Sequence, residues 1–136
     1  MADSSHAKGA TAEDRRYMDR AEDLSDSVRR AKWIHSPDER EDREGQTLVT
    51  RERAVIEAWA KERNAAPATI PGGSAGDGPR VLRFDFPGGS ELEEIDWDDW
   101  FATFEERNLV FIFQQHRSDG SQSNFFRLDN PDRGDA

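Results

Sequence analysis

The aromatic residues of this chain are concentrated in one stretch, which limits where a core can form. Of the 13 Phe, Trp and Tyr residues, 11 lie between Trp59 and Phe126. Each aromatic side chain buries about 150–250 Å², so this stretch can enclose a core. Residues 1–46 hold 12 acidic and nine basic residues with few large apolar side chains, which is too polar a composition to offset the entropy of folding. We therefore expect a charged N-terminal arm at 1–46, a compact domain at 47–130 and a flexible tail at 131–136.

Length and charge exclude several classes of protein. The chain has 136 residues, a formal net charge of -10 and no cysteine. Its longest apolar run, Leu109 to Phe113, is too short to cross a bilayer, and residues 1–16 lack the apolar segment of a signal peptide. The absence of cysteine excludes disulfides and thiol nucleophiles, and the negative charge argues against non-specific binding to nucleic acid or to an anionic membrane. We expect a small, soluble, cytoplasmic protein that is a monomer or a weak homodimer.

The basic residues are dominated by arginine, with 16 Arg against three Lys. Arginine usage of this kind follows from GC-rich coding, but acid-rich, lysine-poor surfaces also stay hydrated in concentrated salt. The sequence leaves both explanations open.

The arm contains one amphipathic pattern. Thr11 followed by Asp14 resembles a capping box, and a narrow apolar stripe at helical spacing follows it: Tyr17, Ala21, Leu24 and Val28. These features predict a helix from about Ala12 to Lys32. Trp33 and Ile34 come next and are the most adhesive residues of the arm. This segment either docks on its own domain or binds a partner. The polar stretch from His35 to Gln46 is typical of a linker.

The compact domain begins with a predicted helix over residues 51–63. Thr50 can cap it, Asn64 suits the left-handed residue after its end, and four residues form its apolar face: Val55, Ile56, Trp59 and Ala60. A second helix is predicted from Asp96, its cap, to Asn108, with an aromatic stripe at helical spacing: Trp97, Trp100, Phe101 and Phe104.

Strands are predicted between and after these helices. Residues 68–70 read as an edge strand, and residues 81–86 alternate apolar and polar residues, as a strand with one buried face does. The run 109–113 is continuously apolar and is predicted to be buried on both faces. A turn at residues 118–121 then leads to a hairpin partner at 124–128. We therefore predict an α+β fold: a small, mainly antiparallel sheet with two helices packed on one side, plus the charged arm with one possible amphipathic helix.

Several of these motifs, taken as a set, resemble a family of short bacterial proteins of uncharacterised function, some of whose members bear the name alpha-glucan branching enzyme. The resemblance covers residues from about 32 to 131 and rests on these segments: Gly45-Gln-Thr-Leu-Val-Thr50, Val55-Ile-Glu-Ala-Trp-Ala-Lys-Glu-Arg63, Pro67-Ala-Thr-Ile-Pro71, Val81-Leu-Arg-Phe-Asp-Phe-Pro-Gly88, Trp97-Asp-Asp-Trp-Phe101 and Ser123-Asn-Phe-Phe126. The resemblance implies no established activity. Branching enzymes place their catalytic carboxylates on a complete (β/α)₈ barrel of about 250 residues, which this chain is too short to contain.

An acidic cluster at residues 91–106 is the main candidate for chemistry. It contains eight acids and no base: Glu91, Glu93, Glu94, Asp96, Asp98, Asp99, Glu105 and Glu106. Paired carboxylates serve glycoside hydrolysis or bind divalent cations. However, a helix start accounts for three of them as one cap and two dipole partners, and the spacing matches no calcium loop. The cluster therefore favours a structural or solubilising role, and we predict no metal and no cofactor.

The three histidines, His6, His35 and His116, do not lie at metal-ligand spacings from one another. Only His116 is predicted near the core. As a general base it would need a carboxylate within hydrogen-bond reach, and the nearest in the sequence is Asp119. A polar residue at the end of a strand is the favoured interpretation.

We interpret the chain as a non-catalytic binding or accessory domain that acts through contacts with an unknown protein partner. The candidate binding residues are the apolar residues of the arm and an aromatic and arginine surface on the sheet: Tyr17, Leu24, Trp33, Arg83, Phe125 and Arg127. One alternative is a small carbohydrate- or nucleotide-active enzyme that uses the cluster at 91–106. Another is a module for single-stranded nucleic acid, because aromatic and arginine side chains together bind single strands.

Overall fold

The computed structural model describes residues 9–19, 31–70, 74–75, 78–79, 81–88 and 92–129. The chain divides into two compact units, Met1–Ile56 with Asn108–Ala136, and Glu57–Arg107. The helix α3 (Arg53–Glu62) begins in the first unit and ends in the second. The α+β class with small, mainly antiparallel sheets is confirmed. Among the described residues, no helix is long and apolar enough to cross a membrane.

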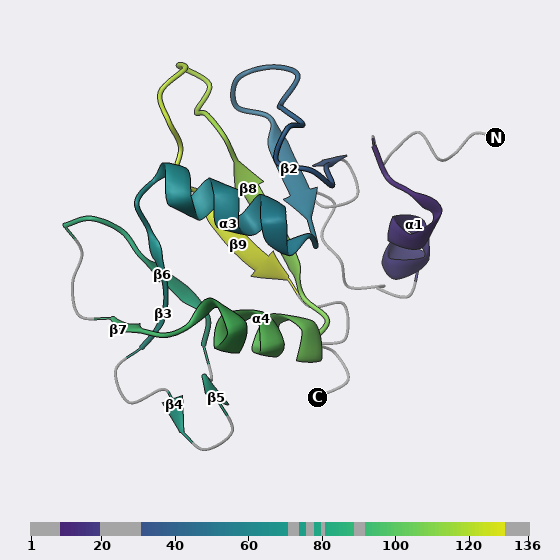
Figure 1. Cartoon of the computed structure of the whole chain (residues 1–136). Helices are drawn as coiled ribbons and strands as arrows, with labels where there is room; N and C mark the ends of the chain where they lie inside the picture. The colour runs from purple at the N-terminus through teal and green to yellow at the C-terminus, as the bar shows by residue number, and fades with distance from the viewer. Residues whose placement is uncertain are drawn as a thin grey trace. The chain divides into compact units, whose positions relative to one another are not determined.

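The first unit is built on a four-stranded sheet with the order β1-β2-β8-β9 (Figure 1). The short β1 (Lys32–Trp33) pairs in parallel with β2 (Thr47–Thr50). The long, buried β8 (Val110–Gln114) pairs antiparallel with β2 on one side and with β9 (Phe126–Asp129) on the other. Strand β8 is buried along residues 110–113, as its continuous apolar run predicted.

The register assigns side chains to the two faces of this sheet, because directly paired residues point to the same face. On one face, Trp33 pairs with Val49, Val49 with Ile112, and Ile112 with Arg127. We call this the Trp33 face; its buried apolar cluster consists of Ala31, Trp33, Val49, Val110 and Ile112. On the opposite face, the ring of Phe111 stacks with those of Phe113 and Phe126, at centroid distances of 5.1 and 5.9 Å.

The boundary predicted at residue 46 separates two strands that the structure pairs. Strand β1 belongs to the predicted arm, and the backbone N–H of Ile34 extends the pairing by donating to the Val49 carbonyl at 3.0 Å. Trp33 and Ile34 are each only 1% exposed. Composition suggested an arm because apolar residues are sparse there. Those at positions 31, 33 and 34 are nevertheless buried, because they complete the sheet and its core.

The N-terminal helix begins as the sequence predicts. Strand β1 is preceded by α1 (Ala12–Asp19), and the capping box is confirmed: the Thr11 N–H donates to Asp14 Oδ2 at 3.0 Å and the Asp14 N–H donates to Thr11 Oγ1 at 3.1 Å. The prediction that the helix extends to Lys32 is wrong at that end. Lys32 lies in β1, where pairing with β2 satisfies its backbone. Residues 20–30, which include Ala21, Leu24 and Val28, lie outside the described residues.

The second unit contains its own sheet of three strands, ordered β6-β3-β7. Its central strand is β3 (Ala66–Thr69), which pairs antiparallel with β6 (Arg83–Asp85) and with β7 (Glu93–Glu94). The prediction of an edge strand here is therefore wrong. A proline in a central strand has no N–H to donate. The carbonyl of Pro67 still accepts the Ile95 N–H at 3.0 Å, on the side of β7, so the proline does not prevent β3 from pairing with both β6 and β7. A separate two-stranded piece joins β4 (Ser74–Ala75) to β5 (Gly78–Pro79).

Stacked aromatic rings form the core of the second unit. The helix α4 (Trp97–Glu106) buries three of the four residues of its predicted stripe, Trp100, Phe101 and Phe104, whereas Trp97 is half-buried. Trp100 stacks on Phe84 of β6 at 5.1 Å and on Phe104 at 5.6 Å. Its indole N–H donates to the Arg83 carbonyl at 3.1 Å, which supplies the partner that a buried tryptophan needs.

The predicted C-terminal ends of both helices are confirmed, but two predicted N-caps are not. The helix α3 begins at Arg53 rather than Arg51, and the Thr50 hydroxyl accepts the Glu52 N–H, at 3.0 Å, before the helix starts. Asn64 and Asn108 each have φ of 55°, the left-handed conformation expected after a helix end. Asp96 occupies the N-cap position of α4, yet its side chain makes no capping hydrogen bond. The prediction that its carboxylate caps the helix is therefore wrong. The carboxylate is exposed and can be hydrated where it stands.

We expect Trp100→Ala to lower the free energy of unfolding by about 3–5 kcal/mol, because it removes a fully buried ring from the aromatic core. Urea denaturation measures the loss. Glu106→Ala, at an exposed position of the same helix, is the control and should change stability by less than about 0.5 kcal/mol. A loss below about 1 kcal/mol for Trp100→Ala would show that the ring is not packed.

We also expect Trp33→Ala to cost about 3–5 kcal/mol, although it lies in the segment that composition assigns to an arm. The indole fills the apolar cluster of the Trp33 face, and no other residue of β1 is as large. Trp33→Phe, which keeps an aromatic ring there, should cost less. If Trp33→Ala leaves the urea midpoint unchanged, residues 31–34 do not belong to the core.

Candidate functional site

One of the predicted binding residues, Trp33, is not on the surface. Trp33 is buried in the first sheet, so the indole cannot serve as the exposed adhesive contact that we predicted. Its size and its position in β1 place it in the core instead. Tyr17 belongs to α1, but its side chain lies outside the described residues, as does the whole of Leu24. Binding by these two residues stays a prediction.

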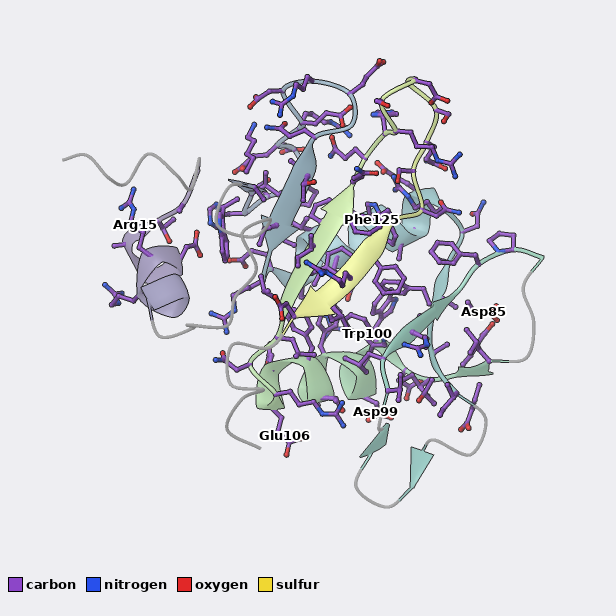
Figure 2. All side chains as sticks on the ribbon, turned by 180° about the vertical axis from the view of Figure 1, so that it is seen from behind. Arg15, Asp85, Asp99, Trp100, Glu106 and Phe125 are labelled. Carbon is purple, nitrogen blue, oxygen red and sulfur yellow. The ribbon has the colours of Figure 1, made fainter. Side chains whose placement is uncertain are left out.

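Two predicted binding residues are close neighbours in the β8–β9 hairpin: Arg127 lies on β9, and Phe125 is the residue just before this strand. The Gln114 N–H donates to the Phe125 carbonyl, and Ile112 pairs with Arg127, so Phe125 and Arg127 alternate along one side of the hairpin. Phe125 is labelled in Figure 2, just before β9. It is 44% exposed, and Arg127 is exposed as well. Phe126 instead points to the opposite face, where it stacks on Phe111. We call Phe125, Arg127 and their exposed neighbour Asn124 the hairpin surface.

Arg83 does not join this surface through a shared sheet. It is exposed on β6, which belongs to the three-stranded sheet of the second unit. The predicted surface that carries Arg83 and Arg127 on one sheet is therefore not formed. Alternation of apolar and polar residues indicates which face of a strand is exposed, but it does not indicate to which sheet the strand belongs.

The acidic cluster is spread over solvated positions. Glu93 and Glu94 are exposed on β7, and Asp96, Asp98 and Asp99 are exposed around the start of α4. Figure 2 shows Asp99 and Glu106 toward opposite ends of this helix. Glu91 lies outside the described residues. Within the part of the chain that the structure describes, no three His, Asp or Glu residues are grouped so that they could hold a metal ion.

A histidine and a carboxylate do meet, but the carboxylate is not the predicted one. His116 Nδ1 lies 2.5 Å from Glu41 Oε2, and the Glu41 N–H donates to the side chain of Gln115 at 2.9 Å. Asp119 instead accepts the N–H and the hydroxyl of Ser121, and these hydrogen bonds hold the pKa of the Asp119 carboxyl below its usual value. The Glu41 side chain is 11% exposed and that of His116 44%. No spacing pattern could have revealed this pair, because 75 residues separate its members.

Two glycines let the loops that carry this pair approach each other. Gly45 has φ of 85°, and its backbone lies so close to that of Ser118 that a Cβ would come within 3.1 Å of the Ser118 Cα. Its N–H donates to the His116 carbonyl at 3.0 Å. Gly120, with φ of 90°, lies against the Glu44 carboxylate. The loop 35–46 is therefore held against the turn of the β8–β9 hairpin by a close backbone approach at Gly45, where the positive φ favours glycine. The contact at Gly120 is with a side chain, and the positive φ is what favours glycine there.

A second histidine and carboxylate pair holds the N-terminal helix. His35 Nε2 lies 2.6 Å from Asp14 Oδ2, and the Asp14 side chain is only 10% exposed. This pair is at the other end of the sheet, because His35 follows β1 near the end of β2, whereas His116 is paired with Gly45 before the start of β2. The two imidazoles therefore do not converge on one site.

Arg63 is a further polar feature, and the sequence analysis did not single it out. Its guanidinium is buried over the ring of Trp59, 4.4 Å from the centroid, and donates to the Trp59 carbonyl at 2.9 Å. Burial lowers the pKa of the Arg63 guanidinium, and Glu62 beside it acts in the opposite direction. This contact satisfies a backbone carbonyl at the end of α3, so we assign it to the fold rather than to a binding site.

Comparison of the chain with known protein families, with curated proteins and with solved structures finds no match. The family resemblance of its motifs therefore stays an expectation from the sequence. The function has to be argued from the hairpin surface, the acidic cluster and the polar pairs described above.

We expect the acidic cluster to bind no divalent cation tightly, because its described carboxylates are exposed on separate elements, β7 and α4 with the residue before it. A calcium site needs six or more oxygens within about 2.6 Å of one ion. Isothermal titration with calcium, magnesium and manganese should give weak heats that disappear as salt is added. Saturable one-site binding tighter than about 10 μM, abolished by Asp98→Asn, would contradict this expectation and favour the enzyme alternative.

Proposed function

We propose that this protein is a non-catalytic binding domain that contacts a protein partner through the hairpin surface. The observation that carries the proposal is the exposure of Phe125, 44%, beside Arg127 on the same side of the hairpin. Aromatic residues and arginine are enriched at protein interfaces, where a phenylalanine ring supplies apolar contact area and a guanidinium donates directed hydrogen bonds. Asn124 and Ser121, exposed in the same hairpin, are small polar residues of the kind that surround such anchors.

The rigidity of the hairpin supports this proposal. Its turn is braced internally, since the Arg117 N–H donates to the Ser121 carbonyl at 2.8 Å and the Gly120 N–H to the Arg117 carbonyl at 2.9 Å. It is braced from outside by the contacts of Gly45 and by the pair of His116 with Glu41. A preorganised surface binds more tightly because less freedom is lost on association.

The enzyme alternative draws less support from the same geometry. It requires two carboxylates that face each other across a substrate, whereas the described acids of the cluster at 91–106 are exposed on β7 and at α4. His116 and Glu41 have the orientation of a base and its positioning carboxylate, but among the described residues no hydroxyl group is hydrogen-bonded to that imidazole. We therefore propose binding as the function. A cytoplasmic location is part of the same proposal.

A photo-crosslinking amino acid at position 125 tests the proposal. Irradiation in an extract of the source cell should link the chain to a protein, and Phe125→Ser should weaken binding of that purified protein at least about tenfold, the effect of losing an interface anchor. Position 70 is the matched control, because Ile70 is also a large exposed apolar residue, at 39%, but belongs to the other unit.

Two outcomes would contradict the proposal. Crosslinks from position 125 to nucleic acid, lost as salt rises, would favour the single-strand alternative. The same set of captured proteins from positions 125 and 70 would show that capture reflects general hydrophobic adhesion and not the hairpin surface.

A further inference from the structure

The segment before α1 docks on the Trp33 face through two small residues. Ala10 packs against the apolar cluster of that face. Gly9 has φ of 77°, and its backbone lies so close to the Trp33 carbonyl oxygen that a Cβ at position 9 would overlap this oxygen. Glycine is therefore needed at position 9 for two separate reasons, its backbone conformation and the space that the carbonyl leaves.

A buried carboxylate adds polar recognition to this contact. Asp14 Oδ2 accepts the Thr11 N–H within the capping box and also lies 2.6 Å from His35 Nε2. A carboxylate so nearly buried has to be hydrogen-bonded to be tolerated. The capping box orients the Asp14 carboxylate. This carboxylate then forms a hydrogen bond with the imidazole of His35, the second residue after β1. The sheet therefore supplies an apolar cluster, a backbone carbonyl and an imidazole that together match a short segment.

The docked segment depends on this contact for its own structure. The helix α1 has eight residues, and an isolated helix of this length is unstable in water because too few hydrogen bonds follow the unfavourable first turn. Docking and helix formation are thus coupled, so the helix reports whether the segment is bound.

We propose that the Trp33 face and His35 form a peptide-docking site that recognises a Gly-Ala-Thr-x-x-Asp segment at the start of a helix. The chain's own residues 9–19 occupy this site in cis, and the same segment presented in trans is its ligand. Because an attached segment has an effective concentration in the millimolar range, the intact chain keeps the site filled. A free segment binds only when the attached one is released. Arg127 of the hairpin surface lies on the same face of the sheet, paired with Ile112. However, the contacts that hold the segment come from the apolar cluster, the Trp33 carbonyl and His35, so the inference does not rest on the proposed function.

The experiment uses the full chain and a fluorescein-labelled peptide of residues 9–19. Gly9→Ala in the chain should release the attached segment, so the amides of residues 12–19 should lose protection from hydrogen exchange. This variant should then bind the peptide saturably and at least tenfold more tightly than the unchanged chain does, as measured by fluorescence anisotropy. Gly88→Ala is the matched control: Gly88 also has positive φ, 81°, but nothing lies within 4 Å of a Cβ there. That variant should behave as the unchanged chain.

Changes in the peptide test the recognition itself. Asp14→Asn in the peptide should weaken binding to the Gly9→Ala chain at least tenfold, and a further His35→Ala change in the chain should remove that difference, as expected for two residues in direct contact. If Gly9→Ala prevents folding, Ala10→Asp in the chain provides a second way to release the segment.

Three results would overturn the inference. The first is unchanged exchange at residues 12–19 in the released variants. The second is peptide binding that is no tighter than to the unchanged chain. The third is equal binding of the Asp14→Asn peptide.

Discussion

The burial of Trp33 is the interaction on which the first sheet depends. This side chain fills the cluster between β1, β2 and β8, and it is 1% exposed. Its backbone pairs with β2, and the backbone of Gly9 packs closely against its carbonyl oxygen. One large residue from a charged, aromatic-poor segment thus connects the N-terminal part of the chain to a cluster whose members outside that segment are Val49, Val110 and Ile112. In a segment with few apolar side chains, the loss of one large buried residue lowers the stability of the sheet strongly, because few other side chains there can fill the space.

Polar contacts then position the loops around that sheet. At one end, Asp14 and His35 hold α1 beside β1; at the other, Glu41 and His116 hold the loop 35–46 beside the β8–β9 hairpin. Both carboxylates are largely buried and both imidazoles are more exposed. Together with the close contact at Gly45, the second pair gives the hairpin surface a fixed frame. A binding surface on a braced hairpin and a docking site for the N-terminal segment thus occupy different parts of the same unit.

Local features of the fold were predictable from the sequence, whereas distant pairings were not. The capping box at Thr11 and Asp14, the left-handed Asn64 and Asn108, and the buried stripe of α4 follow from rules that act within a few residues. The division of the strands between two sheets does not, because alternation indicates a face and not a partner. Nor could the sequence indicate that two residues of β1 would pair with β2, since so short a strand carries no periodic signal. For the candidate sites, exposure of Phe125 and Arg127 was predicted, but the pair of Glu41 and His116 joins loops that only the folded sheet brings together.

Hydrogen exchange at the Ile34 amide tests most directly whether the N-terminal segment belongs to the core. This N–H donates to the Val49 carbonyl at 3.0 Å, next to the buried Trp33. If β1 is an integral strand, the amide should exchange only when the whole sheet unfolds, with the same free energy of opening as the Ile112 amide in β8. Exchange at the rate of an unprotected amide, while Ile112 remains protected, would show that residues 31–34 are not part of the core and would contradict this account.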